Sequence, residues 1–130
     1  MNVAMEFHDS EVSSVEGDAD VLCIRFSAAC VHRSAGTPGV DSGAGYAQAL
    51  ELRLTNPAWA GKPSECIGRL SDGRIHVDGQ LLALVPVPYA NKGDVSLVVQ
   101  FANGAELSAL AKGVTVQQVG EPRYVESFSC

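Results

Sequence analysis

A histidine, an aspartate and a serine stand side by side near the start of the chain, at His8, Asp9 and Ser10, and hydrolytic triads are built from these residue types. Adjacent residues on a strand point to opposite faces, so these three cannot act together through proximity in the sequence alone. Asp9 or Ser10 is better explained as a strand end, where the side chain bonds to its own backbone. We therefore predict no catalytic residue from this motif.

The histidines and cysteines do not form a metal-binding pattern. No His-x-His and no His-x-x-x-His pair occurs, and none of the four cysteines belongs to a Cys-x-x-Cys pair. Cys23 and Cys30 lie on one predicted strand, roughly 23 Å apart and on opposite faces, which excludes a disulfide between them. We expect no metal site, no cofactor and reduced cysteines. Cys30 then lies in the core, and Cys23, on the outer face, is the one candidate for a reactive thiol.

The charge balance bears on the partners of the protein. The net charge is −6, from 9 basic and 15 acidic residues, and the basic residues are scattered singly. Nucleic acids and anionic lipids attract clustered lysines and arginines, so we expect neither nucleic acid nor membrane as a partner. No apolar run approaches the length of about 20 residues that a membrane helix needs. The first residues do not resemble a secretory leader, and we expect a cytoplasmic location.

Hydrophobic residues alternate with polar ones over short runs, a pattern typical of strands with one buried face. The strongest run, 21–32, places Leu22 and Phe26 on the predicted core face and Arg25 on the other face. Its last residue, His32, falls at the end of the core face. This run is the most secure strand of the chain.

Short phrases that contain glycine separate several of these runs. They are Asp72-Gly73, Asp78-Gly79, Lys92-Gly93-Asp94 and Asn103-Gly104. Asp-Gly and Asn-Gly supply the residues with positive φ that tight hairpins need, so we predict a turn at each phrase. The segment 105–112 is different, because its Ala and Leu content favours one or two helical turns that Gly113 would end.

The whole pattern amounts to a series of strands with at most one short helix. Strands that follow one another without a crossover helix pair antiparallel. The length of 130 residues is that of one domain. We therefore predict that residues 1–130 form a single all-β domain, either a small antiparallel barrel or a two-sheet sandwich.

Two predicted loops and one strand point to a ligand pocket. The loop Arg33–Gly45 is long and rich in glycine, and the loop Thr55–Ser64 holds the only tryptophan. Gln48 is a polar residue on the apolar face of the strand that follows the first loop. If a barrel opens there, its mouth would be a binding site; otherwise these residues form a polar rim satisfied by loop backbone. The candidate ligand-binding residues are His32, Tyr46, Gln48 and Trp59.

Turn and strand phrases are spread over most of the chain. They are Phe7-His8-Asp9-Ser10, Gly45-Tyr46-Ala47-Gln48, Leu70-Ser71-Asp72-Gly73-Arg74-Ile75, Val85-Pro86-Val87-Pro88, Lys92-Gly93-Asp94-Val95 and Gly120-Glu121-Pro122-Arg123-Tyr124-Val125-Glu126. Together they resemble small uncharacterised bacterial β-rich proteins. The resemblance implies a small bacterial β domain and carries no activity over to any residue.

These observations favour a binding protein over an enzyme. Our first hypothesis is a non-enzymatic protein-interaction or binding module that uses the two loops and an exposed sheet edge. A protein partner or a second copy in a homodimer would occupy that edge. The alternative is a small-ligand-binding barrel, with hydrolase or isomerase activity as one form of it, in a pocket near the 33–45 loop.

Overall fold

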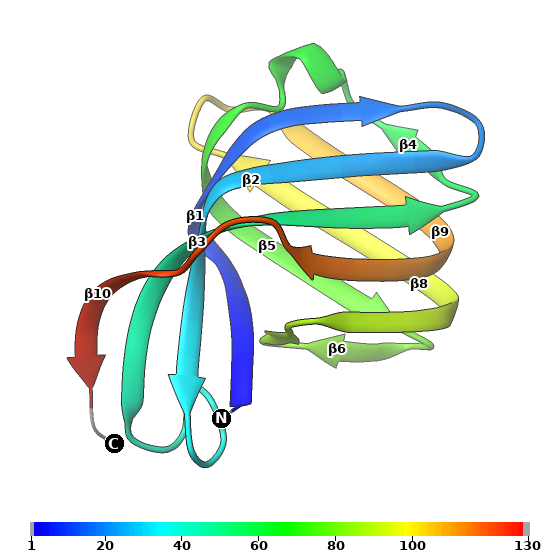
Figure 1. Ribbon diagram of the computed structural model, residues 1–130. Helices are drawn as coiled ribbons and strands as arrows, with labels where there is room; N and C mark the ends of the chain where they lie inside the picture. The colour runs from blue at the N-terminus through cyan, green and yellow to red at the C-terminus, as the bar shows by residue number, and fades with distance from the viewer. Residues whose placement is uncertain (1, 129–130) are drawn as a thin grey trace.

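Six long strands close into an antiparallel barrel in the computed structural model, which describes residues 2–128 (Figure 1). They are β1 (Asn2–Gly17), β2 (Val21–Ser34), β3 (Gly43–Thr55), β5 (Gly68–Val77), β8 (Tyr89–Phe101) and β9 (Glu106–Gln118). Around the barrel the order is β3, β2, β1, β5, β8 and β9, and β3 pairs with β9 to close the ring. The all-β prediction is confirmed, and of the two architectures left open the barrel is the one formed.

Four short strands and one helical turn complete the described chain. β4 (Ala58–Ala60) pairs with β9, β6 (Gln80–Leu82) with β5, β7 (Val85–Pro86) with β1, and β10 (Arg123–Phe128) with β3. The helical turn is a 3-10 turn at Pro63–Glu65. Within residues 2–128, no helix is both long enough and apolar enough to span a bilayer.

The prediction of helical turns over 105–112 is wrong, because residues 106–112 belong to β9. Leu107 and Ala109 are buried, whereas Leu110 is 64% exposed, which is the period of two of a strand. β9 pairs with β8 along one side and with β4 along the other. The hydrogen bonds and packing of both pairings outweigh a helix preference that is worth less than about 1 kcal/mol per residue.

The barrel interior is a packed core. Inward positions on the six strands carry apolar side chains with almost no exposure, the largest of them being Leu22, Ile24, Leu50, Leu52, Leu54, Leu70, Ile75, Leu97 and Leu107. Side chains fill the interior of small barrels of this kind. Ligand sites are therefore to be sought at the rim and on the outer surface.

β1, β2 and β3 bend where they leave the barrel. β1 is irregular between Glu6 and Glu11, and β2 has a bulge between Phe26 and Ala29. Near the same level β3 changes neighbours, from β9 at Leu50 to β10 further along. Bulges bend strands, and beyond this level the three strands and β10 form a curved sheet that projects from the barrel at the lower left of Figure 1. We call this sheet the extension; it comprises residues 2–6, 29–34, 43–48 and 123–128.

The strand end predicted at Asp9 and Ser10 proves to be the irregularity in β1. The strand continues to Gly17, and Asp9 takes a positive φ of 65°. Ser10 is fully buried, and its hydroxyl donates to the carbonyl of Glu6 (2.5 Å) and accepts from the backbone N–H of Cys30 (2.9 Å). The side chain thus satisfies backbone groups that the irregular ladder leaves open.

The bulge in β2 reverses the faces that the sequence pattern predicted beyond it. Ala29 and Val31 are buried and point inward, so Cys30 and His32 lie on the outer face. The prediction that Cys30 and His32 share the core face is therefore wrong, because a bulge adds a residue and shifts the alternation. Arg33 takes the inward position instead.

Cys23 is also placed differently from the prediction. Its residue is 5% exposed, although it lies on the outer face of β2. In the sheet it stands between Glu16 of β1 and Arg53 of β3, whose long side chains flank it. Burial raises the pKa of the Cys23 thiol. It is therefore not the reactive thiol that the sequence suggested.

Two of the four predicted turns are confirmed. Asp78 and Gly79 have φ of 50° and 80° between β5 and β6, and Gly104 has φ of 93° between β8 and β9. The other two predictions are wrong: Asp72-Gly73 lies within β5, and Lys92-Gly93-Asp94 forms an irregularity inside β8. Glycine at 73 is required by contact rather than by a turn, since a β-carbon there would lie 2.7 Å from Cβ of Phe7.

The loops are shorter than predicted. β2 continues through Ser34 and β3 begins at Gly43, so residues 35–42 form the first connection. The carboxylate of Asp41 accepts a 2.6 Å hydrogen bond from the backbone N–H of Thr37 and so ties this connection to itself. The second predicted loop, 55–64, contains β4.

Candidate functional site

The structure does not bring the four predicted ligand residues into one pocket. Tyr46 and Gln48 lie on the inner face of the extension, opposite Val31 and Ala29 of β2. His32 lies on the outer face of the same sheet, where it and Tyr46 line one groove, and Trp59 belongs to β4 on the barrel. Three separate environments therefore have to be considered.

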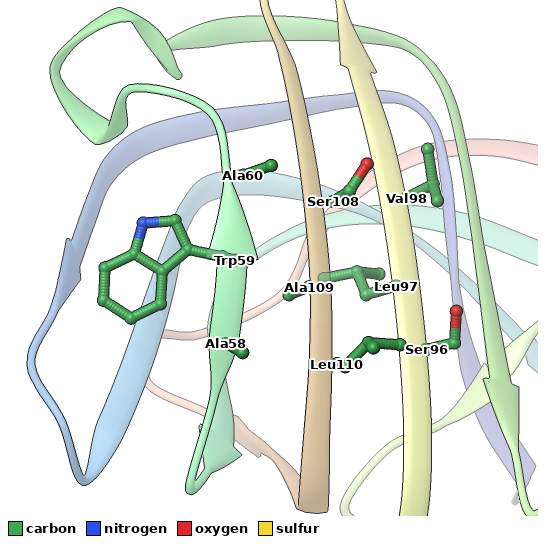
Figure 2. Close-up of a pocket in the computed structure, with 9 residues that line it drawn as sticks. All are labelled: Ala58, Trp59, Ala60, Ser96, Leu97, Val98, Ser108, Ala109 and Leu110. Atoms are coloured by element: carbon green, nitrogen blue, oxygen red, sulfur yellow. The ribbon is translucent and has the colours of Figure 1, made fainter.

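Trp59 is a structural residue of the barrel wall. A β-carbon at Gly17 would lie 2.8 Å from its ring, so the indole rests against the turn between β1 and β2, at the other end of the hairpin from the extension. Trp59 is one of the residues that line a surface groove of 310 Å³ across β4, β9 and β8, and Figure 2 shows its ring on the side of β4 away from Leu97 and Val98. The groove is lined mainly by small and apolar side chains such as Ala58, Val98 and Leu110, so it offers few polar groups to orient a ligand.

His32 is paired with Glu6 on the outer face of the extension. Its Nε2 lies 3.0 Å from Oε2 of Glu6. Cys30 and Glu126 line the same groove, whose volume is 200 Å³. Burial raises the pKa of the Cys30 thiol, which keeps it protonated at neutral pH and unsuited to act as a nucleophile. Among residues 2–128, no group of three or more His, Cys, Asp or Glu is arranged to hold a metal ion.

The third environment, on the inner side, is a cavity of 410 Å³ where the chain crosses from β9 to β10. We call it the Gln48 cavity; its lining residues are Arg33, Gln48, Gln118, Val119, Gly120, Glu121 and Pro122. The backbone N–H groups of Val119 and Gly120 both donate to the carbonyl of Ala49, at 3.0 and 3.3 Å. These bonds hold the crossing segment against the point where β3 changes neighbours.

Gln48 presents a hydrogen-bond acceptor to its surroundings that nothing in the described chain satisfies. The residue is 4% exposed, and its Nε2 donates a 2.7 Å hydrogen bond to the carbonyl of Gly120. A carbonyl oxygen only accepts, so this bond identifies the nitrogen and leaves the oxygen on the other side of the amide. That oxygen, Oε1, is buried and has no partner among the described residues.

Arg33 carries a second unsatisfied polar atom. Its guanidinium carbon lies 4.9 Å from the centre of the Tyr46 ring, a cation–π arrangement, and Tyr46 meets Tyr124 edge to face at 5.7 Å. Stacking on the ring restricts the guanidinium and holds it over β3. The Arg33 Nε is buried and has no hydrogen-bond partner within residues 2–128.

The alternation in the sequence indicates Tyr46 and Gln48 but neither Arg33 nor the crossing segment. β3 has no bulge between Leu50 and Tyr46, so its alternation could be followed from the barrel into the extension. A period of two along β2 assigns Arg33 to the outer face, and only the bulge turns it inward. Glu121 lies in the connection after β9, and no local pattern indicates that this connection comes to lie beside Gln48 of β3.

The Gln48 cavity is suited to binding a polar molecule. An unpaired buried polar atom costs about 1–3 kcal/mol, and two such atoms of opposite character belong to residues that line this one cavity. Among residues 2–128, none of those that line it is Ser, Cys or His, which are the common nucleophiles and bases. Comparisons with protein-family models, with curated proteins and with solved structures find no match for this chain, so its fold and this cavity are the grounds for assigning a function.

Proposed function

We propose that the protein is a non-enzymatic binding module that holds a small polar molecule in the Gln48 cavity. The observation that carries the proposal is the Oε1 atom of Gln48, which is buried and unpaired on a residue that is 4% exposed. Buried side-chain oxygens nearly always have a partner. A ligand that donates a hydrogen bond would supply it once the Gln48 side chain turns this buried oxygen toward the cavity.

Two further features support a small-molecule site. The cavity volume of 410 Å³ falls in the range of about 300–1,000 Å³ that is usual for ligand pockets. Arg33 is held by Tyr46 before any ligand arrives, and a side chain that is already restricted loses less entropy on binding. Among the lining residues the one carboxylate is Glu121. The described part of the chain places no second carboxylate or imidazole there to share acid–base work, which favours binding over catalysis.

The test is a thermal-shift screen of a library of polar metabolites with three proteins: the wild type, Gln48→Leu and Gln100→Leu. Gln100 is an exposed glutamine of β8 and serves as the matched control. We expect at least one compound to raise the melting temperature of the wild type and of the Gln100 variant but not of the Gln48 variant. If no compound does so, or if the Gln48 variant responds equally, the proposal is wrong.

Association of two copies is a second candidate function, favoured by exposed apolar side chains near the C-terminal strand. Val119, Tyr124 and Val125 are each at least 60% exposed, and among the described strands β10 pairs only with β3. The register of β10 shifts between Tyr124 and Glu126, and such a bulge limits strand pairing at the free edge. Two copies would therefore meet through these apolar side chains rather than by pairing their edge strands. Native mass spectrometry over a range of concentrations tests this candidate: a dimer that Val125→Glu dissociates supports it, and a monomer throughout excludes it.

The state of the cysteines supports a proposal about location. Cys23, Cys30 and Cys66 are free thiols, and free thiols are typical of reducing compartments such as the cytoplasm. Alkylation of the protein in freshly lysed source cells should therefore label these thiols after denaturation without prior reduction. Recovery of oxidised thiols would contradict a cytoplasmic location.

A further inference from the structure

The side-chain amide of Asn103 joins two parts of the chain that are far apart in the sequence. Asn103 is an exposed residue of the turn between β8 and β9. Its Nδ2 donates to the carbonyl of Glu65 (2.9 Å) and, over a longer distance of 3.4 Å, to the carbonyl of Ile67. Its Oδ1 accepts from the backbone N–H of Ala105 (2.9 Å). The oxygen thus shapes the turn, and the nitrogen holds the turn against the segment 62–67.

The two carbonyls that accept from Asn103 lie on either side of Cys66. Cys66 is fully buried in the barrel core, although Glu65 and Ile67 beside it are exposed. The segment 62–67, which includes the 3-10 turn at the top of Figure 1, therefore lies over this end of the core with the Cys66 side chain inward. Within residues 2–128, the other hydrogen bonds of this segment join its own residues. The Asn103 amide is thus its hydrogen-bonded link to the barrel.

Asn103 is also the one asparagine of the four in the chain that precedes a glycine. Gly104 has no β-carbon to shield its backbone nitrogen, so this nitrogen can attack Cγ of Asn103. A bond forms between the Gly104 nitrogen and Cγ, the bond from Cγ to Nδ2 breaks, and the proton of Gly104 leaves with the ammonia. Water then opens the cyclic imide and leaves a carboxylate at position 103, in an aspartate or an isoaspartate residue.

The fold slows this reaction but does not prevent it. The Gly104 N–H donates to the carbonyl of Phe101 (3.0 Å), so the nitrogen must leave this bond before it can attack. The turn is open to water, because Asn103 and Gly104 are exposed and line a surface hollow of 530 Å³. Exposed turns open locally at a much lower free-energy cost than core strands. Deamidation then proceeds from brief openings of the turn.

The product of deamidation cannot maintain the contact with the segment 62–67. A carboxylate only accepts hydrogen bonds, so at position 103 it would face the carbonyl oxygens of Glu65 and Ile67 without a hydrogen to donate. Both hydrogen bonds are lost, and repulsion between oxygen atoms takes their place. The segment is then free to move away from the barrel, and Cys66 moves with it.

We propose that Asn103 is a site of spontaneous deamidation and that its conversion releases the segment 62–67 and exposes the thiol of Cys66. The step is irreversible because the ammonia is lost. The site uses none of the residues that line the Gln48 cavity, so this inference is independent of the proposed function.

The first experiment tests the modification. The wild-type protein is incubated at 37 °C and pH 8, in native buffer and in urea, and its peptides are mapped by mass spectrometry over time. We expect the mass gain of deamidation at Asn103 in both conditions, faster in urea, and slower conversion at Asn2, Asn56 and Asn91. If Asn103 is unconverted in native buffer when the urea sample has converted fully, the inference is wrong.

The second experiment tests the release of Cys66. Labelling by iodoacetamide at pH 8 is followed peptide by peptide in fresh wild type, in aged wild type and in Asn103→Asp. Loss of the two hydrogen bonds should raise the labelling rate of Cys66 about tenfold or more, whereas the rate at Cys23 should not change. Asn56→Asp, at an exposed asparagine between β3 and β4, adds the same charge and should label like fresh wild type.

Each outcome of the labelling decides the inference. Equal labelling of Cys66 in fresh and deamidated protein overturns the release. Faster labelling of Cys23 together with Cys66 shows that the whole barrel opens, and it also contradicts a local release. If Asn103→Asp does not fold, the aged wild type decides, because it folded with asparagine in place.

Discussion

The side-chain amide of Gln48 donates a 2.7 Å hydrogen bond to the carbonyl of Gly120, which lies 72 positions later in the chain. This bond joins β3 to the segment that crosses from β9 to β10. Because the amide nitrogen donates to Gly120, the amide oxygen Oε1 is the atom that remains without a hydrogen-bond partner among the described residues. One contact between distant residues thus both positions the crossing segment and leaves an acceptor unpaired beside the cavity.

Replacing Gln48 by Leu tests whether this amide serves folding or binding. The change removes a hydrogen bond worth about 0.5–1.5 kcal/mol but also removes an unpaired buried oxygen that costs about 1–3 kcal/mol. We expect the free energy of unfolding, measured with urea, to change by less than about 1 kcal/mol while ligand stabilisation is lost. A loss of more than about 2 kcal/mol would show that Gln48 mainly supports the fold.

Gly73→Ala should destabilise the barrel where β5 passes Phe7 of β1. The new β-carbon would lie 2.7 Å from Cβ of Phe7 and 3.1 Å from a methyl group of Val99. Phe7 is 2% exposed and cannot move away freely, so we expect a loss of about 1–3 kcal/mol in urea unfolding, as for other overpacked cores. Gly113→Ala is the control, because the closest atoms to its new β-carbon would be 3.4 Å away. Equal stability of both variants would contradict the contact.

Glu51→Gln should lower stability at neutral pH and much less in acid. Burial raises the pKa of Glu51, but the guanidiniums of Arg53 and Arg25, each 3.2 Å from its carboxylate, outweigh burial and lower the pKa below the ordinary 4.5. A carboxyl group with a lowered pKa stabilises the folded state above its ordinary pKa, and this contribution is lost as the pH falls through the folded pKa.

We therefore expect the free energy of unfolding of Glu51→Gln to be lower than that of the wild type by at most about 1 kcal/mol at pH 7, as for partly exposed ion pairs. This difference shrinks below pH 4.5. Urea unfolding at pH 3 to 8 measures it. Glu11→Gln provides the control, since the Glu11 carboxylate has no ion pair among the described residues. A difference that stays constant across this range would contradict the ion-pair network.

Cys23 and Cys66 should resist alkylation in the folded protein. Cys23 is 5% exposed and Cys66 fully buried, and burial raises the pKa of both thiols above the ordinary 9.0. With iodoacetamide at pH 8, mass spectrometry should find both sites unlabelled until denaturant is added. Rapid labelling of either site in native buffer would show that the barrel opens locally.

The same two thiols make stability depend on alkaline pH. Above pH 9.0 the unfolded chain loses thiol protons that the folded chain still holds. The free energy of unfolding therefore falls as the pH rises through that value. Urea unfolding of Cys23→Ala should show a smaller decrease in the free energy of unfolding with pH than the wild type. An unchanged pH dependence would show that other groups cause it.

The positions of Tyr46 and Gln48 could be predicted from the alternation of residues along one strand, β3. The alternation along β3 placed Tyr46 and Gln48 on the face of Leu50, and the structure confirms that placement because β3 runs without a bulge there. Arg33 could not be placed in this way. Its side depends on the bulge between Phe26 and Ala29, which arises from pairing with β3 and leaves no mark in the local pattern.

The sequence by itself determined most of the strands, though not the first half of β9, together with the antiparallel pairing and the turns at Asp78-Gly79 and Asn103-Gly104, because alternation and positive φ are local properties of a few neighbouring residues. The tertiary structure decided that the sheet closes as a barrel, that Gly73 makes room for Phe7, and that Arg33 turns toward the face that holds Gln48. These outcomes depend on register and packing between strands far apart in the chain. A bulge or a closed ladder gains its stability from those distant partners, so the local pattern cannot specify it.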